Sequence, residues 1–203
     1  NTLKISVCDS ANAYKKSIDL SSNSVTIDAT VGSNTVYIAG ANTAVVQDVI
    51  DDLATGDVLQ VGNSTIGYQY LKVSSIASVT TNTAVTFTDR YYLSEDVTMD
   101  STVNRYWEYF DTVDATPGTT AYTAARGGAD DGIHVVVIDE DGSVTGTPKT
   151  ILEVWEGLSR ATDARGEQGG SIFYKDVINS GSKYIWYANP CLLYTSPSPR
   201  DLC

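Results

Sequence analysis

Short runs that alternate β-branched or aromatic residues with polar ones fill the stretch from about Leu20 to Val97, and they constrain the fold more than any other feature. Glycine, asparagine, aspartate and serine separate these runs, as at Gly32-Ser33-Asn34 and Gly56-Asp57. Short strands at this spacing predict a compact antiparallel β-sandwich or small β-barrel over residues 20–98. The runs are SVTIDATV, NTVYIA, DVLQVG, YQYLKVSSI and TAVTFTDRYYL.

One segment inside this block has a helical pattern instead. In TAVVQDVIDDLATG, four apolar residues recur at helical spacing: Val46, Val49, Ile50 and Leu53. Gly56 follows them at the place of a helix C-cap. We therefore expect a short helix between the strands.

Residues 133–190 have the sequence patterns of strands and a helix that pack in layers. The run IHVVVID is apolar from Ile133 to Ile138, as in a strand buried on both faces. SIFYKDVIN has helical spacing, with Ser171 as its predicted N-cap and 179–181 as its end. Apolar residues from Tyr184 to Tyr187 predict another strand. This order indicates an α/β layer over residues 133–190.

The two ends of the chain differ in character. Residues 1–8 alternate as a strand, with Leu3, Ile5 and Val7 on one face, and we expect Cys8 to be a buried free thiol. Residues 9–19 read as a polar connection or short helix, so we assign 1–19 to the same core as 133–190. Between the blocks, residues 99–132 hold an aromatic cluster (Tyr106, Trp107, Tyr109 and Phe110), typical of a core or a subunit contact, and then a loop rich in Gly, Thr and Ala.

The segment KTILEVWEGLSRATDARG fits two structures nearly equally well. Thr150 with Glu153 three residues on matches a capping box, and the apolar residues that follow have helical spacing. However, TILEVWE also suits a strand, and Gly157 weakens a helix by about 1 kcal/mol relative to alanine.

Charge and hydropathy exclude several classes of protein. Thirteen Lys and Arg against 25 Asp and Glu give a net charge of −12, which would repel a polyanion, so we expect no nucleic-acid partner. No apolar run approaches the roughly 20 residues needed to cross a bilayer, and no signal peptide is visible, so we expect no membrane insertion.

The residues that carry chemistry do not form a catalytic pattern. His134 is the single histidine, it adjoins an apolar strand, and no Gly-x-Ser-x-Gly elbow is present. The loop that begins at Asp139 has Val144 and Thr150 where a calcium-binding EF-hand needs Gly and Glu, so a hairpin turn at Asp141-Gly142 is the better interpretation.

Two further patterns are weak. GDVLQVGNSTIG matches neither a phosphate-binding loop nor a dinucleotide fingerprint. The pairs Asp51-Asp52 and Asp130-Asp131 read as solvated loop residues. We therefore predict no catalytic, cofactor-binding or metal-binding residue, no cofactor, and a protein that is not an enzyme.

A series of motifs in the second half runs from the strand into Asp139-Glu140-Asp141-Gly142, through ILEVWEGLS and Asp163-Ala164-Arg165, to YKDVIN and SKYIW. This series resembles the core of a contractile-tail sheath protein of myovirus-type bacteriophages. LKISVCDS and RYWEYFDTVDATPGT also resemble segments of such sheaths. The resemblance covers about 100 of the 203 residues.

The resemblance implies a fold and a function. It implies an α+β chain in which an α/β sheath-core layer is interrupted by the inserted β-sandwich or β-barrel at 20–98, where sheaths carry a variable domain. It implies that ILEVWEGLS is extended, which favours the strand. It implies a virion protein, assembled in the host cytoplasm, whose subunits polymerise around the tail tube and contract to drive it through the host envelope.

The same resemblance implies the partners. They are other sheath subunits in a helical homo-oligomer, the tail tube protein, and the baseplate and tail terminator proteins. Terminal arms of sheath subunits pair with sheets of their neighbours by strand addition. Because family members are much longer, this chain resembles a fragment.

Two other functions compete with this one. The Thr, Ser, Asn and Tyr texture of 20–97 also suits a β-rich surface or adhesion module of a secreted or virion protein. The hypothesis that the chain is an enzyme rests only on the analogy between part of the sheath core and subtilisin-like folds. The presence of a single histidine, His134, argues against that hypothesis.

The last thirteen residues, CLLYTSPSPRDLC, differ from the rest in composition. Residues 191–201 resemble the translation of a sequencing-library adapter, so we expect 191–203 to be non-native and exclude them from the fold.

Overall fold

Antiparallel sheets dominate the computed structural model, which is a mixed α+β fold. The structure describes residues 2–18, 26–28, 30–39, 43, 44, 47, 51, 53–79, 82–88, 93–96 and 102–188. The chain divides into two compact units: a first unit of Asn1–Asp9 with Pro117–Cys203, and a second unit of Ser10–Thr116. The second unit is therefore inserted between two stretches of the first.

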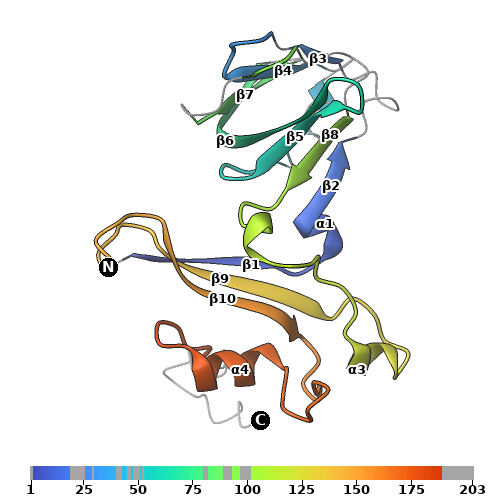
Figure 1. Ribbon diagram of the computed structural model, residues 1–203, viewed down its shortest axis with the longest axis vertical. Helices are drawn as coiled ribbons and strands as arrows, with labels where there is room; N and C mark the ends of the chain where they lie inside the picture. Colours follow the sequence, from blue (N-terminus) through green and yellow to red (C-terminus); the bar gives the residue numbers. More distant parts are fainter. Residues whose placement is uncertain are drawn as a thin grey trace, which may run out of the picture. The chain divides into compact units, whose positions relative to one another are not determined.

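The sheet of the first unit has three strands in the order β1-β9-β10 (Figure 1). β1 spans Leu3–Cys8, β9 Gly132–Asp139 and β10 Thr150–Ser159, and both pairings are antiparallel. All eight residues of β9 are buried, which confirms the prediction from its continuous apolar run. Cys8 is a buried free thiol, as expected.

Helix α4 (Tyr174–Gly181) packs on this sheet. Ile178 of α4 joins a core cluster with Ile133, Val135 and Leu158, against which Trp155 and Tyr174 also pack. The predicted N-cap was wrong: Phe173 is the N-cap and makes no side-chain bond. The Ser171 hydroxyl lies two residues earlier, where it donates to Asp176 and accepts from the Phe173 amide.

The segment 150–159 is a strand and not a helix, in agreement with the resemblance. β10 shifts register against β9 in two places, between Ile151 and Glu153 and between Trp155 and Leu158. Gly157 lies in the second shift at φ +65°, a left-handed conformation that a residue with a Cβ rarely adopts. The glycine that argued against a helix thus serves a β-bulge.

A seven-stranded sheet forms the second unit, in the order β2-β8-β5-β6-β7-β4-β3 with antiparallel pairs throughout. Each of the five runs predicted as strands contains a strand, which confirms the prediction of strands there. Their bounds are Thr26–Asp28 (β3), Thr35–Ala39 (β4), Val58–Asn63 (β5), Gly67–Val79 (β6) and Asn82–Phe87 (β7).

β6 has thirteen residues and belongs to both halves of this sheet. Its first part pairs with β5, its later part pairs with β7, and a register shift lies between Val73 and Ser75. The two halves share one core cluster, because alternate residues of their strands point to the same side. The cluster comprises Ile18, Val36, Ile38, Leu53, Leu59, Val61, Leu71, Val73, Val85, Phe87, Leu93 and Val103.

The short helix α1 agrees with one of the two alternatives for residues 9–19, whereas other elements lie where the sequence predicted loops or connections. Residues 9–19 contain the short helix α1 (Ala11–Tyr14) and the strand β2 (Lys15–Ile18). Residues 99–132 contain β8 (Thr102–Tyr106), the 3-10 helix η1 (Phe110–Thr112) and α3 (Ala121–Ala124). The second unit, Ser10–Thr116, is thus wider than the predicted insertion at 20–98.

The remaining predictions have mixed outcomes. The predicted strand from Tyr184 to Tyr187 was wrong, since residues 182–188 form no strand. Of the helix expected over 43–56, residues 43, 44, 47 and 51 are helical, whereas Val46, Val49 and Ile50 lie outside the described residues. The tail at 191–203 also lies outside them.

Candidate functional site

His134, the single histidine and thus the residue that most invited a catalytic interpretation, lies on β9, the central strand of the first unit's sheet. Its side chain is buried on β9, and Nδ1 accepts a hydrogen bond of 3.2 Å from the Gly157 amide. That bond holds the β10 bulge against the central strand. An imidazole that accepts at Nδ1 carries its proton on Nε2, so His134 is occupied in fixing backbone geometry.

The loop between β9 and β10 is organised by its own carboxylates. Asp139 is fully buried, and its Oδ2 accepts bonds from the Val144 amide at 3.0 Å and from the Thr145 amide and hydroxyl at 2.7 and 2.8 Å. Burial raises the pKa of Asp139, but the donors of Thr145 and Val144 outweigh it and lower the pKa overall. The reversal is a hairpin, as predicted, but a ten-residue loop that Asp139 closes replaces the predicted tight turn at Asp141-Gly142.

Asp141 makes a second set of contacts in this loop. It accepts bonds from the Ser143 amide at 3.0 Å and from the Thr2 amide at 2.9 Å. The hydrogen bonds from Ser143 hold the pKa of Asp141 well below its usual range. Among the described residues, no group of three or more His, Cys, Asp or Glu side chains could hold a metal ion. Asp141 thus ties the loop to Thr2, the residue before β1.

Asp131 contradicts the prediction that the Asp130-Asp131 pair is solvated. Its side chain is 7% exposed and accepts from the Thr120 amide and hydroxyl, each at 2.8 Å, and from the Ser159 hydroxyl. Burial raises the pKa of Asp131, but the bonds from Ser159 and Thr120 outweigh it and lower the pKa to about 2. Asp131 therefore joins three segments: the start of β9, the end of β10 and the N-cap of α3.

Asp51, from the other predicted pair, accepts a bond of 2.7 Å from the Gln47 side chain and is exposed. Asp52 lies outside the described residues.

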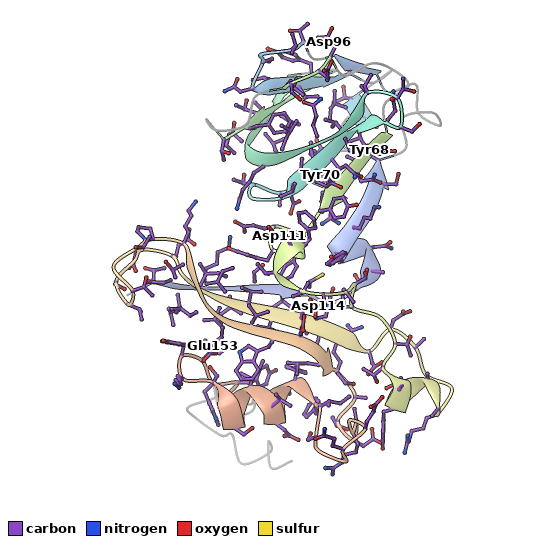
Figure 2. All side chains as sticks on the ribbon, in the orientation of Figure 1. Tyr68, Tyr70, Asp96, Asp111, Asp114 and Glu153 are labelled. Atoms are coloured by element: carbon purple, nitrogen blue, oxygen red, sulfur yellow. The ribbon has the colours of Figure 1, made fainter. Side chains whose placement is uncertain are left out.

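A carboxylate clamp connects β10 to the end of α4. Glu153 accepts bonds from the Trp155 indole at 3.0 Å, the Ser182 hydroxyl at 2.7 Å and the Lys183 amide at 2.8 Å. Burial raises the pKa of Glu153, but the bonds from Lys183, Ser182 and Trp155 outweigh it and lower the pKa overall. In Figure 2, Glu153 lies beside the turn that follows α4.

The clamp requires a small residue at the end of the helix. A Cβ placed on Gly181 would lie 2.8 Å from the Trp155 ring, closer than side-chain atoms normally approach. The absence of a side chain at Gly181 thus lets the indole reach Glu153. Two of the quoted motifs, ILEVWEGLS and SKYIW, meet at this point of the first unit.

The segment after α4 is held by side chains and not by a sheet. The Asn179 side chain donates to the Tyr187 carbonyl at 3.2 Å and accepts from the Tyr187 amide at 2.7 Å, while Lys175 Nζ lies 4.2 Å from the centre of the Tyr187 ring. The Ser182 hydroxyl accepts from the amides of Tyr184 and Ile185. With its backbone groups bonded to α4 in this way, the segment does not form the predicted strand.

An apolar cavity of about 310 Å³ lies between the helix-covered face of the sheet and the segment after α4. Ile5 and Val7 of β1 are 52% and 50% exposed there, and Trp186 is 65% exposed. β1 and β10 are the outer strands of the sheet. The cavity is lined by Ile5, Val7, Ile133, Val135, Ile178 and Trp186, with four other residues. The first unit therefore presents apolar side chains and outer strands that a neighbouring chain could cover.

Sequence reasoning missed both Asp131 and Glu153 as connecting residues. The partners of Asp131 come from residues 11 positions before it and 28 after it, and those of Glu153 lie up to 30 positions on. For Asp131 the only local signal was a carboxylate next to a buried strand, and Glu153, inside a partly exposed strand, had no such signal.

A scan against protein-family models and searches of curated proteins and of solved structures found no match. Within the described residues, no helix is long and apolar enough to span a bilayer.

Proposed function

We propose that this chain is part of a subunit of a myovirus-type contractile tail sheath. The observation that carries the proposal is that the motifs from Asp139 to Trp186 fold into the first unit, where ILEVWEGLS contacts both YKDVIN and SKYIW. RYWEYFDTVDATPGT, in contrast, lies mostly in the second unit. Glu153 and Trp155 of ILEVWEGLS bond to, or pack against, Gly181, Ser182 and Lys183, next to and within SKYIW. Fortuitous motif matches scattered over a chain have no reason to meet in this way.

The position of the second unit supports the same proposal. The chain leaves the first unit after Asp9 and returns at Pro117, so that β1 and β9 pair across an insertion. Sheaths carry a variable domain inserted into their core, and the resemblance implies such a domain at this point. The second unit has its own sheet and its own core, as an inserted domain requires.

The proposed role is structural. Subunits polymerise around the tail tube, bound to other sheath subunits, the tube protein and the baseplate and terminator proteins, and contraction of the assembly drives the tube through the host envelope. The outer strands β1 and β10 and the exposed apolar side chains Ile5, Val7 and Trp186 are the surfaces that suit contacts with neighbouring subunits. Such contacts let rigid units move relative to each other while they remain connected.

Electron microscopy of the complete gene product tests this proposal. The full open reading frame is expressed alone and with the neighbouring tail-tube gene, and the products are examined in negative stain. We expect rings or tubular polymers, and we expect Glu153→Ala to reduce them. Monodisperse particles without polymers, at any salt and protein concentration and with the tube protein present, would contradict the proposal.

A β-rich surface or adhesion module is the second candidate. The observation that favours it is the exposure of Tyr37, Tyr68 and Tyr70 on the second unit, at 51%, 49% and 45%. Tyrosine supplies large contact area with little loss of conformational freedom. Binding of the isolated chain to host cells, without any polymer of the full gene product, would favour this candidate over the sheath.

A further inference from the structure

The half of the second unit's sheet formed by β2, β8, β5 and the first part of β6 has an outward surface of aromatic rings and side-chain amides, which we call the tyrosine face. It consists of Tyr14, Tyr68, Tyr70, Tyr106 and Phe110 with Gln60 and Asn104. Gln60 on β5 pairs with Tyr70 on β6 and with Asn104 on β8. Alternation along these strands points Leu59 and Leu71 into the core. The side chains of Gln60, Tyr70 and Asn104 therefore lie together on the opposite side.

Four rings of this face form one continuous cluster: Tyr14, Tyr70, Tyr106 and Phe110. Tyr70 lies parallel to Phe110, with ring centres 6.1 Å apart and planes 13° apart. Tyr106 lies 4.7 Å from Phe110 and 6.4 Å from Tyr14, measured between ring centres. Tyr68 and Tyr70 lie two residues apart on β6, on the same side of the strand, and both are about half exposed (Figure 2). The cluster thus offers ring surface to a ligand.

The amides hold Tyr70 in a fixed position. Asn104 Nδ2 donates to Gln60 Oε1 at 2.8 Å, and Gln60 Nε2 donates to the Tyr70 hydroxyl at 2.6 Å. Because that hydroxyl accepts from Gln60, its own proton remains to be donated elsewhere. Gln60 and Asn104 are 8% and 7% exposed, so the two hydrogen-bonded amides that orient the Tyr70 ring are themselves buried and held in place. A ligand that stacks on Tyr70 meets a prearranged surface.

Charge distinguishes this face from the rest of an acidic chain. The outward strand positions around Tyr70 include Lys15 and Lys72 but no carboxylate, whereas the net charge of the chain is −12. The exposed carboxylate of Asp111 follows Phe110 in η1. Lys72 is paired with Glu108 at 3.1 Å. Lys15 Nζ lies 5.1 Å from the centre of the Tyr106 ring, is exposed, and has no ion pair with any residue that the structure describes. Lys15 is therefore a cation beside the rings that an anion can reach.

We propose that the tyrosine face binds an acidic oligosaccharide, whose pyranose rings stack on Tyr70 and Tyr68 and whose carboxylate, farther along the chain of sugars, pairs with Lys15. The C–H groups on one face of a pyranose carry partial positive charge and suit the negative face of an aromatic ring. Sugar hydroxyls accept from the Tyr70 hydroxyl, and the carboxylate makes a charge-assisted bond with the ammonium. A purely apolar partner would leave the proton of the Tyr70 hydroxyl without an acceptor, which is unfavourable.

The test uses the full chain and matched pairs of glycans. A panel holds sialylated and uronic-acid oligosaccharides beside their neutral parents, for example sialyllactose beside lactose, and hits are quantified by calorimetry. We expect at least one acidic glycan to bind more tightly than its neutral parent. We expect Tyr70→Ala and Tyr68→Ala each to weaken binding about tenfold, and Lys15→Gln to remove the preference for the acidic member.

Tyr37→Ala is the matched control, because Tyr37 is equally exposed on β4, in the other half of the sheet. It should leave binding unchanged. Thermal unfolding of each variant shows that the fold is retained, and Tyr70→Phe, which keeps the ring, should retain most of the binding.

Three outcomes overturn the proposal. The first is that no acidic glycan of the panel binds. The second is that binding survives the loss of both Tyr68 and Tyr70. The third is dimerisation of the free chain that Tyr70→Ala abolishes, which would assign the face to a second copy of this chain. The test needs no assembled polymer, so its result is independent of the sheath proposal.

Discussion

Asp131 is a buried carboxylate whose charge is held by donors from distant parts of the chain. Its pKa of about 2 lies below the value near 3.9 of an aspartate in an unfolded chain. A carboxyl group with a lowered pKa stabilises the fold at pH values above its unfolded pKa, and this stabilisation is lost as the pH falls through the folded pKa. The contribution of Asp131 should therefore be complete at pH 6 and largely gone at pH 2.

Urea unfolding of Asp131→Asn against the wild type measures this contribution. At pH 7 we expect the variant to be less stable by about 1–3 kcal/mol, because an amide nitrogen cannot accept from the hydroxyls of Thr120 and Ser159. The difference should shrink between pH 4 and pH 2. Asp163→Asn is the control, since Asp163 is exposed and has a single side-chain partner, at 3.2 Å. A difference that stays constant down to pH 2 would contradict the assignment.

Gly181 ends α4 where the Trp155 ring approaches. Gly181→Ala places a methyl group 2.8 Å from that ring, and we expect it to lower the free energy of unfolding by about 1–3 kcal/mol. Gly170→Ala is the matched control, since no atom lies within 4 Å of its added Cβ. An alanine at 181 that stabilises the protein, as helix propensity alone favours, would show that the indole gives way without loss.

Individual residues show where sequence reasoning ends. The burial of Cys8 followed from its place in an alternating strand, a local pattern. The burial of Asp131 did not, because hydroxyl and amide donors from Thr120 and Ser159 outweigh its desolvation, and no local pattern places those donors beside it.

At the scale of elements, β10 and α4 are joined by Glu153. Glu153→Gln removes the charge and leaves one oxygen for three donors: Trp155, Ser182 and Lys183. We expect faster hydrogen exchange at the amides of Lys183, Tyr184 and Ile185, with little change in β9. Mass spectrometry of peptides over 150–188 measures it, and Glu167→Gln, an exposed change, is the control. Equal exchange in both variants would show that Glu153 does not hold the segment.

Elements with a strong local pattern were predictable, and those without one were not. Each of the five alternating runs of the second unit contains a strand, and α4 begins within SIFYKDVIN. β2 was missed because Lys15, Lys16 and Ser17 lack an apolar alternation, yet pairing with β8 makes them a strand. The run YIWY was expected to be a strand, but Asn179 and Ser182 bond to its backbone in place of a partner strand.

At the scale of the whole molecule, two units with separate cores should unfold separately. We expect two transitions in calorimetry. Leu59→Ala, at a fully buried position, should lower the free energy of unfolding of the second unit by about 2–5 kcal/mol and so lower the midpoint of its transition. Gly181→Ala should lower the midpoint of the transition of the first unit. A single transition that both variants shift would show that the units fold as one.

The pairing of β2 with β8 has a consequence for how such genes change. Lys15 and Tyr106 are paired partners, so the segment that enters the second unit and the segment that leaves it are hydrogen-bonded neighbours. A block whose two ends lie side by side can be cut out of one gene and joined into another without stretching the recipient chain. Recombination at the codons around residues 10 and 116 would exchange the whole module, and any specificity it carries, while the β1–β9 pairing keeps its register.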